Sequence, residues 1–331
     1  MDFIELIDLA SEKLGGSVLY ANDDFFAAKE NLIRAAAPVW KEGIYTDDGK
    51  WMDGWETRRR RSPRLEEKFD WCIIRLGMPG EIKGVVVDTA YFKGNFPSHC
   101  SLEACAADGQ PDLAQLTSDA TEWREILPIS ELNGDAQNKF EITASGRITH
   151  MRFKIYPDGG VARLRAHGHV LPNWDALKNR NSEVDLAAAE NGGDVIAASD
   201  EFFGHRQNLI MPGLARDISD GWETRRRRGP GPGHDWCIVR LGAKGTSTRV
   251  EIDTSFFRGN YPESCMLEGG VLTGNDLNSI AWRELLPMSK LQAHTRHTFD
   301  DISDVGVITH VRLNIFPDGG VSRLRLFGRI V

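Results

Sequence analysis

The chain has 331 residues, a length that favours two domains because a single hydrophobic core rarely exceeds about 250–300 residues. A hydrophobic share of 41% and a formal net charge of −8 are typical of a globular protein and exclude a general nucleic-acid binder, which would be basic. The start MDFIELIDLA lacks the basic and apolar regions of a secretion signal, and no apolar run reaches the roughly 20 residues of a membrane span, so we expect neither. Five cysteines without tight spacing predict reduced thiols and a cytoplasmic location.

Along the chain, strand patterns dominate and helical patterns are scarce. Residues 2–14 give the best helical pattern. Alternating apolar side chains then predict strands at Cys72–Leu76 and His150–Ile155. The sequence PDGG at Pro157–Gly160, repeated at Pro317–Gly320, predicts a tight turn after the second of these strands. Many short strands separated by turns predict an all-β fold of the β-sandwich or jelly-roll type.

The two halves of the chain repeat one another along their whole length. DGWETRRRR occurs identically at Asp53–Arg61 and Asp220–Arg228, and DWCIIRLG from Asp70 matches DWCIVRLG from Asp235. Each copy holds a full set of strands, so we predict two jelly rolls in tandem rather than one large barrel. The predicted domains are residues 1–170 and 185–331, joined by a polar, Asn-rich linker at 171–184.

The copies differ most between Asn31 and Asp53, where the first copy carries the longer segment RAAAPVWKEGIYTDDGKWM. Loops absorb differences in length while strands do not, so this segment is predicted to be a loop. It contains Trp40, Tyr45 and Trp51, and long loops of this kind often form lids or subunit contacts. We therefore predict that the two copies are unequal in function.

Several repeated motifs resemble those of known families. In each copy, Asp-Gly and a Thr precede a Trp…Leu-Gly strand, an order similar to that of the galactose-binding-domain-like jelly roll. The set DGWETRRRR, DWCI(I/V)RLG, DT…GN(F/Y)P, WRE(I/L)LP and THxR…PDGGVxRLR looks much more like the allantoicase repeat, and it occurs twice. The chain thus resembles the allantoicase family over nearly its whole length. That resemblance implies two tandem jelly-roll repeats and hydrolysis of allantoate to ureidoglycolate and urea during purine nitrogen recovery.

The implied partner is one small molecule, allantoate, with no nucleic acid and no membrane, and we expect a homo-oligomer. Allantoate is a carboxylate on a carbon that bears two ureido groups. Arginine forks suit the carboxylate, amide side chains suit the ureido groups, and a carboxylate or histidine suits the proton transfers. The candidate catalytic residues are therefore Glu56, Glu223, His150 and His310. The candidate substrate-binding residues are Trp55, Arg58, Asn95, Arg163, Arg165, Trp222, Arg225, Asn260, Arg323 and Arg325.

Each candidate also has a structural interpretation, which stays open. The Glu-Thr-Arg of the arginine motif lies on a predicted loop beside a tryptophan, whereas its later arginines are expected to be solvated or paired with acidic residues. A histidine on a strand is often a hydrogen-bonded structural residue. The Gly-Asn sequences also fit tight turns, and Cys72 and Cys237 lie on apolar strand faces typical of a core.

No dense metal-binding motif is present, because HExxH, paired CxxC and EF-hand loops are all missing from the sequence. We therefore expect neither a metal nor another cofactor. The alternative to an enzyme is a tandem lectin-like module that binds an anionic glycan or small acid without chemistry. Release of urea from allantoate distinguishes the two.

Overall fold

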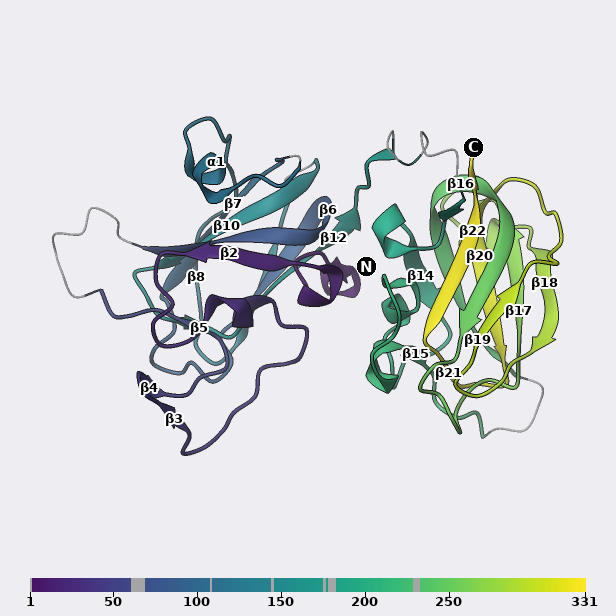
Figure 1. Ribbon diagram of the computed structural model, residues 1–331, viewed down its shortest axis with the longest axis horizontal. Helices are drawn as coiled ribbons and strands as arrows, with labels where there is room; N and C mark the ends of the chain where they lie inside the picture. The colour runs from purple at the N-terminus through teal and green to yellow at the C-terminus, as the bar shows by residue number, and fades with distance from the viewer. Residues whose placement is uncertain are drawn as a thin grey trace. The chain divides into compact units, whose positions relative to one another are not determined.

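A computed structural model describes residues 2–60, 69–107, 109–143, 146–174, 177, 183–228 and 233–331. The chain divides into two compact units, Met1–Leu171 (unit 1) and Pro172–Val331 (unit 2), each of which contains one sequence repeat (Figure 1). Of the linker predicted at 171–184, residues 175, 176 and 178–182 lie outside the described residues. Each unit is a jelly-roll β-sandwich, so the predicted all-β tandem fold is confirmed.

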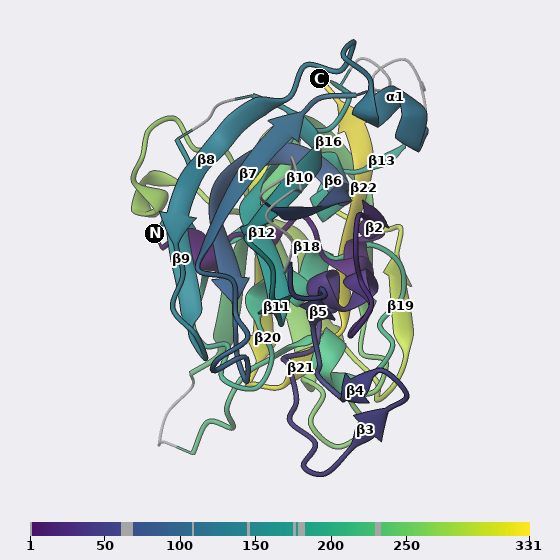
Figure 2. The same cartoon turned by 90° about the vertical axis from the view of Figure 1, so that its left-hand side faces the viewer.

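Unit 1 is built around one long strand, β6 (Asp70–Asp88). Its first part pairs with β2 and β10, and its last part pairs with β9 and β12, so β6 belongs to both groups of strands. The first group has the order β2 (Ser17–Ala21), β6, β10 (Ile148–Tyr156), β7 (His99–Cys105), β8 (Arg124–Glu131). The second has the order β1 (Ile7–Asp8), β12 (Arg163–Val170), β6, β9 (Gln137–Glu141). Figure 2 shows β8, β7 and β10 side by side.

The core of unit 1 lies between these groups. Cys72, Ile74 and Val85 of β6 are fully buried, as is Phe153 of β10, because their side chains alternate onto the inner face. The prediction that Cys72 is a core residue is therefore confirmed, and burial raises the pKa of its thiol. On the outer face, Leu116 of the short helix α1 (Leu113–Thr117) covers Ile73.

Unit 2 repeats this arrangement. Its long strand is β16 (Asp235–Asp253), in which Cys237 is buried like Cys72. The first group has the order β14 (Asp194–Ala198), β16, β20 (Ile308–Phe316), β17 (Ser264–Gly270), β18 (Arg283–Lys290). The second has the order β13 (Val184–Asp185), β22 (Arg323–Ile330), β16, β19 (Arg296–Phe299).

The helix expected at residues 2–14 is wrong. The segment forms two single-turn 3₁₀ helices, Phe3–Glu5 and Glu12–Leu14, on either side of β1. Ile7 and Asp8 pair with the edge of β12, and this tertiary pairing outweighs the helical preference of a segment too short to be stable as an isolated helix. The apolar positions that suggested a helix, such as Leu9 and Leu14, are buried against the sandwich instead.

Further 3₁₀ helices of at most five residues lie in the described part of the chain at Lys29–Ile33, Ala189–Asn191, Arg206–Ile210, Ile218–Asp220 and Leu277–Ser279. Within the described part of the chain, every helix is too short to span a bilayer. Three two-stranded ribbons complete the fold: β3 (Tyr45–Thr46) with β4 (Gly49–Lys50), β5 (Trp55–Glu56) with β11 (Gly160–Val161), and β15 (Trp222–Glu223) with β21 (Gly320–Val321).

Candidate active site

The arginine motif begins in the ribbon β5–β11 at one end of unit 1. Glu56 lies opposite Gly160, and Thr57 exchanges hydrogen bonds with Gly159 of the PDGG turn. Trp55 is fully buried, and its indole N–H donates to the carbonyl of Asp23 across 2.8 Å. Since successive side chains of a strand point to opposite faces, burial of Trp55 directs Glu56 away from the core.

Glu56 is bonded to the Gly-Asn loop that follows β6. Its Oε1 accepts a hydrogen bond from Nδ2 of Asn95 across 2.7 Å. Burial raises the pKa of the Glu56 carboxyl, and the bond from Asn95 and the nearby Arg59 oppose that rise only partly. A carboxyl with a raised pKa holds and releases protons closer to neutral pH, as general acid–base chemistry requires.

Asn95 also lines a cavity of about 540 Å³, which we call the unit 1 cavity. Its walls are Trp40, Lys50, Met52, Tyr91, Lys93, Gly94 and Asn95. The volume suits a small molecule. One side chain, Asn95, therefore connects the cavity to the carboxyl of Glu56.

The segment present only in the first copy forms much of this cavity. It contributes Trp40, Lys50 and Met52, and its hairpin β3–β4 extends from the end of unit 1 (Figure 1). The Lys50 ammonium lies 4.2 Å from the centre of the Trp40 ring, and the Trp40 and Tyr91 ring centres are 5.8 Å apart. These contacts hold the loop against the residues that follow β6.

The cavity combines two cations with aromatic walls. Lys93 is exposed over 77% of its side chain, and its nearest carboxylate partner, Asp135, is 3.7 Å away. Lys50 is also exposed. Two ammonium groups suit a carboxylate, the rings of Trp40 and Tyr91 suit a planar group, and the Oδ1 of Asn95 can accept from an N–H donor.

The arginines beside Glu56 are used by neighbouring carboxylates. Arg58 binds Asp23 (Nε to Oδ2, 2.7 Å), and Arg59 binds Asp158 (Nη1 to Oδ1, 2.8 Å). Arg60 donates from Nε to Oδ1 of Asp70 across 2.9 Å, so it is paired with an acidic residue as expected, but the pair is largely buried. Arg61 lies outside the described residues. The structure therefore places Arg58 in an exposed ion pair and not in the wall of the unit 1 cavity.

Arg163 and Arg165 of β12 hold loops in place. Arg163 is 1% exposed, and its guanidinium donates to the carbonyls of Ala36 and Asp53 and to the Asp53 carboxylate. Arg165 donates to the carbonyl of Ala35. Both arginines thus fix the two ends of the segment that forms the unit 1 cavity. Their hydrogen bonds hold this segment in place, and the Arg163 guanidinium is buried beneath it.

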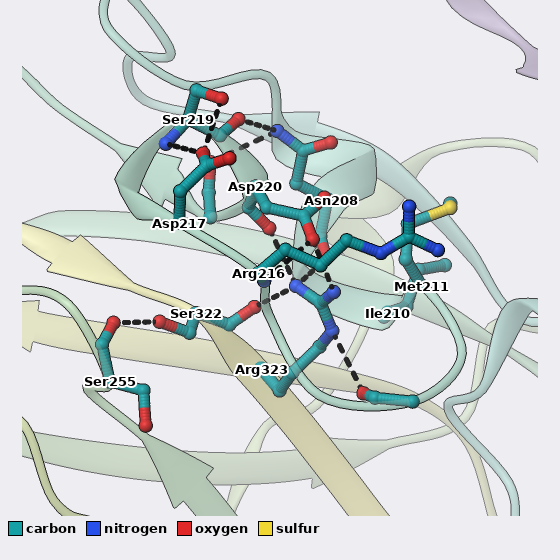
Figure 3. Close-up of polar contacts among 12 residues, drawn as sticks. Asn208, Ile210, Met211, Arg216, Asp217, Ser219, Asp220, Ser255, Ser322 and Arg323 are labelled. Atoms are coloured by element: carbon teal, nitrogen blue, oxygen red, sulfur yellow. Dashed lines mark hydrogen bonds and ion pairs between the residues drawn. The ribbon is translucent and has the colours of Figure 1, made fainter. Parts of the chain in front are cut away.

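In unit 2 the corresponding arginines, Arg323 and Arg325, hold a loop in the same way, and we call each such arginine pair a clamp (Figure 3). The Arg323 guanidinium is 3% exposed and donates to the carbonyls of Asn208, Gly213 and Asp220 and to the Asp220 carboxylate. Arg325 donates to the carbonyls of Met211 and Gly213. Because each arginine satisfies several backbone carbonyls of one loop, the repeated RLR sequence fixes the loop that precedes each arginine motif.

The histidines lie in the sandwich, far from the glutamates. His150 is 1% exposed near the start of β10, whereas Glu56 pairs with Gly160, beyond the other end of that strand. Six residues of β-strand from His150 to Tyr156 span about 20 Å. Burial and the charge of Arg75 lower the pKa of His150 to about 4, and burial also lowers that of His310. The structure does not bring either histidine to the glutamate of its unit.

Unit 2 repeats the glutamate–asparagine pair without the cavity-forming segment. Asn260 donates to Oε1 of Glu223, and Trp222 is fully buried with its indole N–H bonded to the carbonyl of Asp200. Arg225 is exposed and paired with Asp200. The two copies therefore share the pair but differ in what surrounds it.

Sequence reasoning missed Lys50, Tyr91 and Lys93. Lysine and tyrosine in loops have no motif of their own, so nothing in the sequence singled them out. Two signals pointed to the region: the longer segment of the first copy, and the Gly-Asn loop in which Lys93 immediately precedes Gly94.

Comparison with known proteins agrees with this architecture. The family model for the allantoicase repeat matches residues 7–171 and again 184–331. The chain belongs to the allantoicase family. A probable allantoicase of Photobacterium profundum is 48% identical, and one of Stutzerimonas stutzeri is 50% identical, each over 99% of this chain and 98% of the relative. The crystal structure of allantoicase from Saccharomyces cerevisiae is 36% identical, with a TM-score of 0.82 over 98% of this chain and 93% of that chain.

Proposed function

We infer that this chain is an allantoate hydrolase whose active site is the unit 1 cavity together with Glu56. Membership of the allantoicase family, over both repeats and nearly the whole chain, supports the reaction. The observation that carries the location is Asn95, which lines the cavity and bonds to Glu56 across 2.7 Å.

The substrate matches the cavity group by group. Allantoate has one carboxylate and two planar ureido groups on a single carbon. Lys50 and Lys93 bind the carboxylate, and Trp40 and Tyr91 stack against a ureido plane. Asn95 accepts an N–H from the ureido group nearest to Glu56. The second lone pair of its oxygen leaves room for another donor.

Glu56 carries the proton transfers in this proposal. As a carboxylate it takes a proton from the water whose oxygen attacks the central carbon. The bond from that carbon to one ureido nitrogen breaks as the new bond to oxygen forms, because the saturated carbon holds only four bonds, and Glu56 returns the proton to the departing urea. Water thus supplies the hydroxyl of ureidoglycolate and one hydrogen of urea. The raised pKa of Glu56 favours both transfers, because a carboxyl group whose pKa lies closer to neutral pH can accept a proton from water and then donate it to urea.

The experiment is a urea-release assay with purified protein and allantoate. The expected products are urea and ureidoglycolate in equal amounts, and Glu56→Gln is the inactive control. A folded wild-type chain that releases no urea above background contradicts the proposal. If it binds allantoate without releasing urea, the non-catalytic binding module is the correct function.

We also propose a cytoplasmic homo-oligomer. All five cysteines are free and buried, which fits a reducing compartment. Sedimentation of the purified chain tests the oligomer, and a monomer at micromolar concentration contradicts it.

A further inference from the structure

Unit 2 has an open depression of about 560 Å³ beside its glutamate–asparagine pair. We call it the unit 2 depression, and its wall includes Arg226, Arg227, Asn260, Glu263, Lys290 and Asp318. It contains none of the residues that correspond to the cavity-forming segment of unit 1, so it is a separate surface with its own chemistry.

Two of its cations have no partner in the described residues. Neither the Arg226 guanidinium nor the Lys290 ammonium makes a hydrogen bond or ion pair with any residue that the structure describes, and both are exposed. Arg227 differs, because it is bound to Asp235 across 2.8 Å. Asp318 is also engaged, since its Oδ2 accepts the backbone N–H of Arg227 across 2.7 Å.

The first copy provides an internal comparison. Arg59, the counterpart of Arg226, is occupied by Asp158 and by the carbonyl of Gly94. In the matching strand motifs WREILPISEL and WRELLPMSKL, Glu131 stands where unit 2 has Lys290. Compared with unit 1, unit 2 thus has a lysine in place of a glutamate, and the guanidinium of Arg226 is not bound as that of Arg59 is. One further acid, Glu263, replaces Ser98 and offsets part of this gain.

We propose that the unit 2 depression binds a small carboxylate that carries a ureido or amide group. Arg226 binds the carboxylate by its planar fork, and Lys290 adds a second cationic contact. Asn260, whose Nδ2 is committed to Glu223, offers its Oδ1 to an N–H of the ligand. The proposal rests on unit 2 alone and does not require that unit 1 be catalytic.

Acetylation of individual lysines tests the proposal in the full chain. The protein is treated with trace acetic anhydride, with and without N-carbamoylglycine, and modification at each lysine is quantified by mass spectrometry. N-carbamoylglycine has the carboxylate and one ureido group but no second urea to release. It should slow acetylation of Lys290, and the neutral N-carbamoylglycinamide should not.

The matched variants are Arg226→Gln and Arg225→Gln. Arg226→Gln should weaken protection of Lys290 about tenfold, because one charged hydrogen-bond donor to the carboxylate is lost. Arg225→Gln removes a neighbouring exposed arginine that is already paired with Asp200, and protection should persist. Equal acetylation of Lys290 with and without the carboxylate, or full protection in Arg226→Gln, overturns the proposal. Acetylation of Lys93 in the same sample measures ligand binding to the unit 1 cavity. The two sites are therefore tested independently, and absence of binding in unit 1 does not affect the result for unit 2.

Discussion

Asn95 donates a hydrogen bond to Glu56 across 2.7 Å, although 39 residues separate them in the sequence. Asn260 and Glu223 repeat this bond in unit 2. Because both units contain the glutamate–asparagine pair but differ in the residues around it, comparing variants of the two units distinguishes the role of the pair from the role of the surrounding residues. In unit 1 the pair borders an aromatic, cationic cavity, and in unit 2 it borders an open depression.

Glu56→Gln should lower kcat for allantoate about 10²–10⁴-fold, because glutamine cannot take or return a proton. Asn95 can still bond to the amide oxygen, so substrate binding should change little. The matched control is Glu223→Gln, which should keep most of the activity. Turnover is measured by urea release. Equal losses in the two variants would show that the two copies contribute equally to activity.

Lys93→Ala should raise KM for allantoate about tenfold with a smaller effect on kcat, since it removes one cationic contact to the carboxylate. Lys83→Ala is the control, because Lys83 is paired with Glu81 on the surface of the same unit. Steady-state kinetics decide the outcome. An unchanged KM in Lys93→Ala would place the carboxylate elsewhere, and Arg58 would become the next residue to test.

Arg163→Met should destabilise unit 1 by about 3–5 kcal/mol, because the buried Asp53 carboxylate loses its hydrogen-bonded guanidinium and keeps only Arg34, 3.7 Å away, while two loop carbonyls lose their donor. Arg58→Met removes only an exposed ion pair and should cost about 0–1 kcal/mol. Urea unfolding monitored by tryptophan fluorescence measures both. Similar small losses would mean that Arg163 is not a clamp.

His150 should remain neutral well below its ordinary pKa of 6.5, because burial and Arg75 lower its pKa to about 4. Unfolding restores the ordinary pKa, so the unfolded chain binds a proton that the folded chain does not. This contribution to the free energy of unfolding is complete above about pH 6.5 and falls by about 2 kcal/mol by pH 5. An NMR titration that shows the His150 imidazole protonating near pH 6.5 in the folded chain would refute it.

Activity should survive exhaustive dialysis against EDTA, because the sequence contains no dense metal-ligand motif. The measurement is urea release before and after dialysis, with metal content determined in parallel. Loss of activity that one divalent ion restores would identify a metal site assembled from distant residues.

The architecture of this protein can be predicted from its repeated sequence patterns. Two copies of the same strand patterns and turn motifs require two similar β units, because a period of two with regular turns fits only a sheet. The motif set also identified the family, and the longer segment of the first copy marked where the copies differ. These features are local in sequence or repeated, so they could be found without coordinates.

The contacts of each polar residue, in contrast, depend on how distant segments fold together. Arg59 meets Asp158 across 99 residues, and Arg163 meets Asp53 across 110, so no spacing rule reveals that these arginines are occupied. The local pattern at residues 2–14 likewise predicted a helix, but pairing with β12 decided otherwise. A charged side chain binds a substrate only if no nearer partner satisfies it, and the fold alone sets which partners are near.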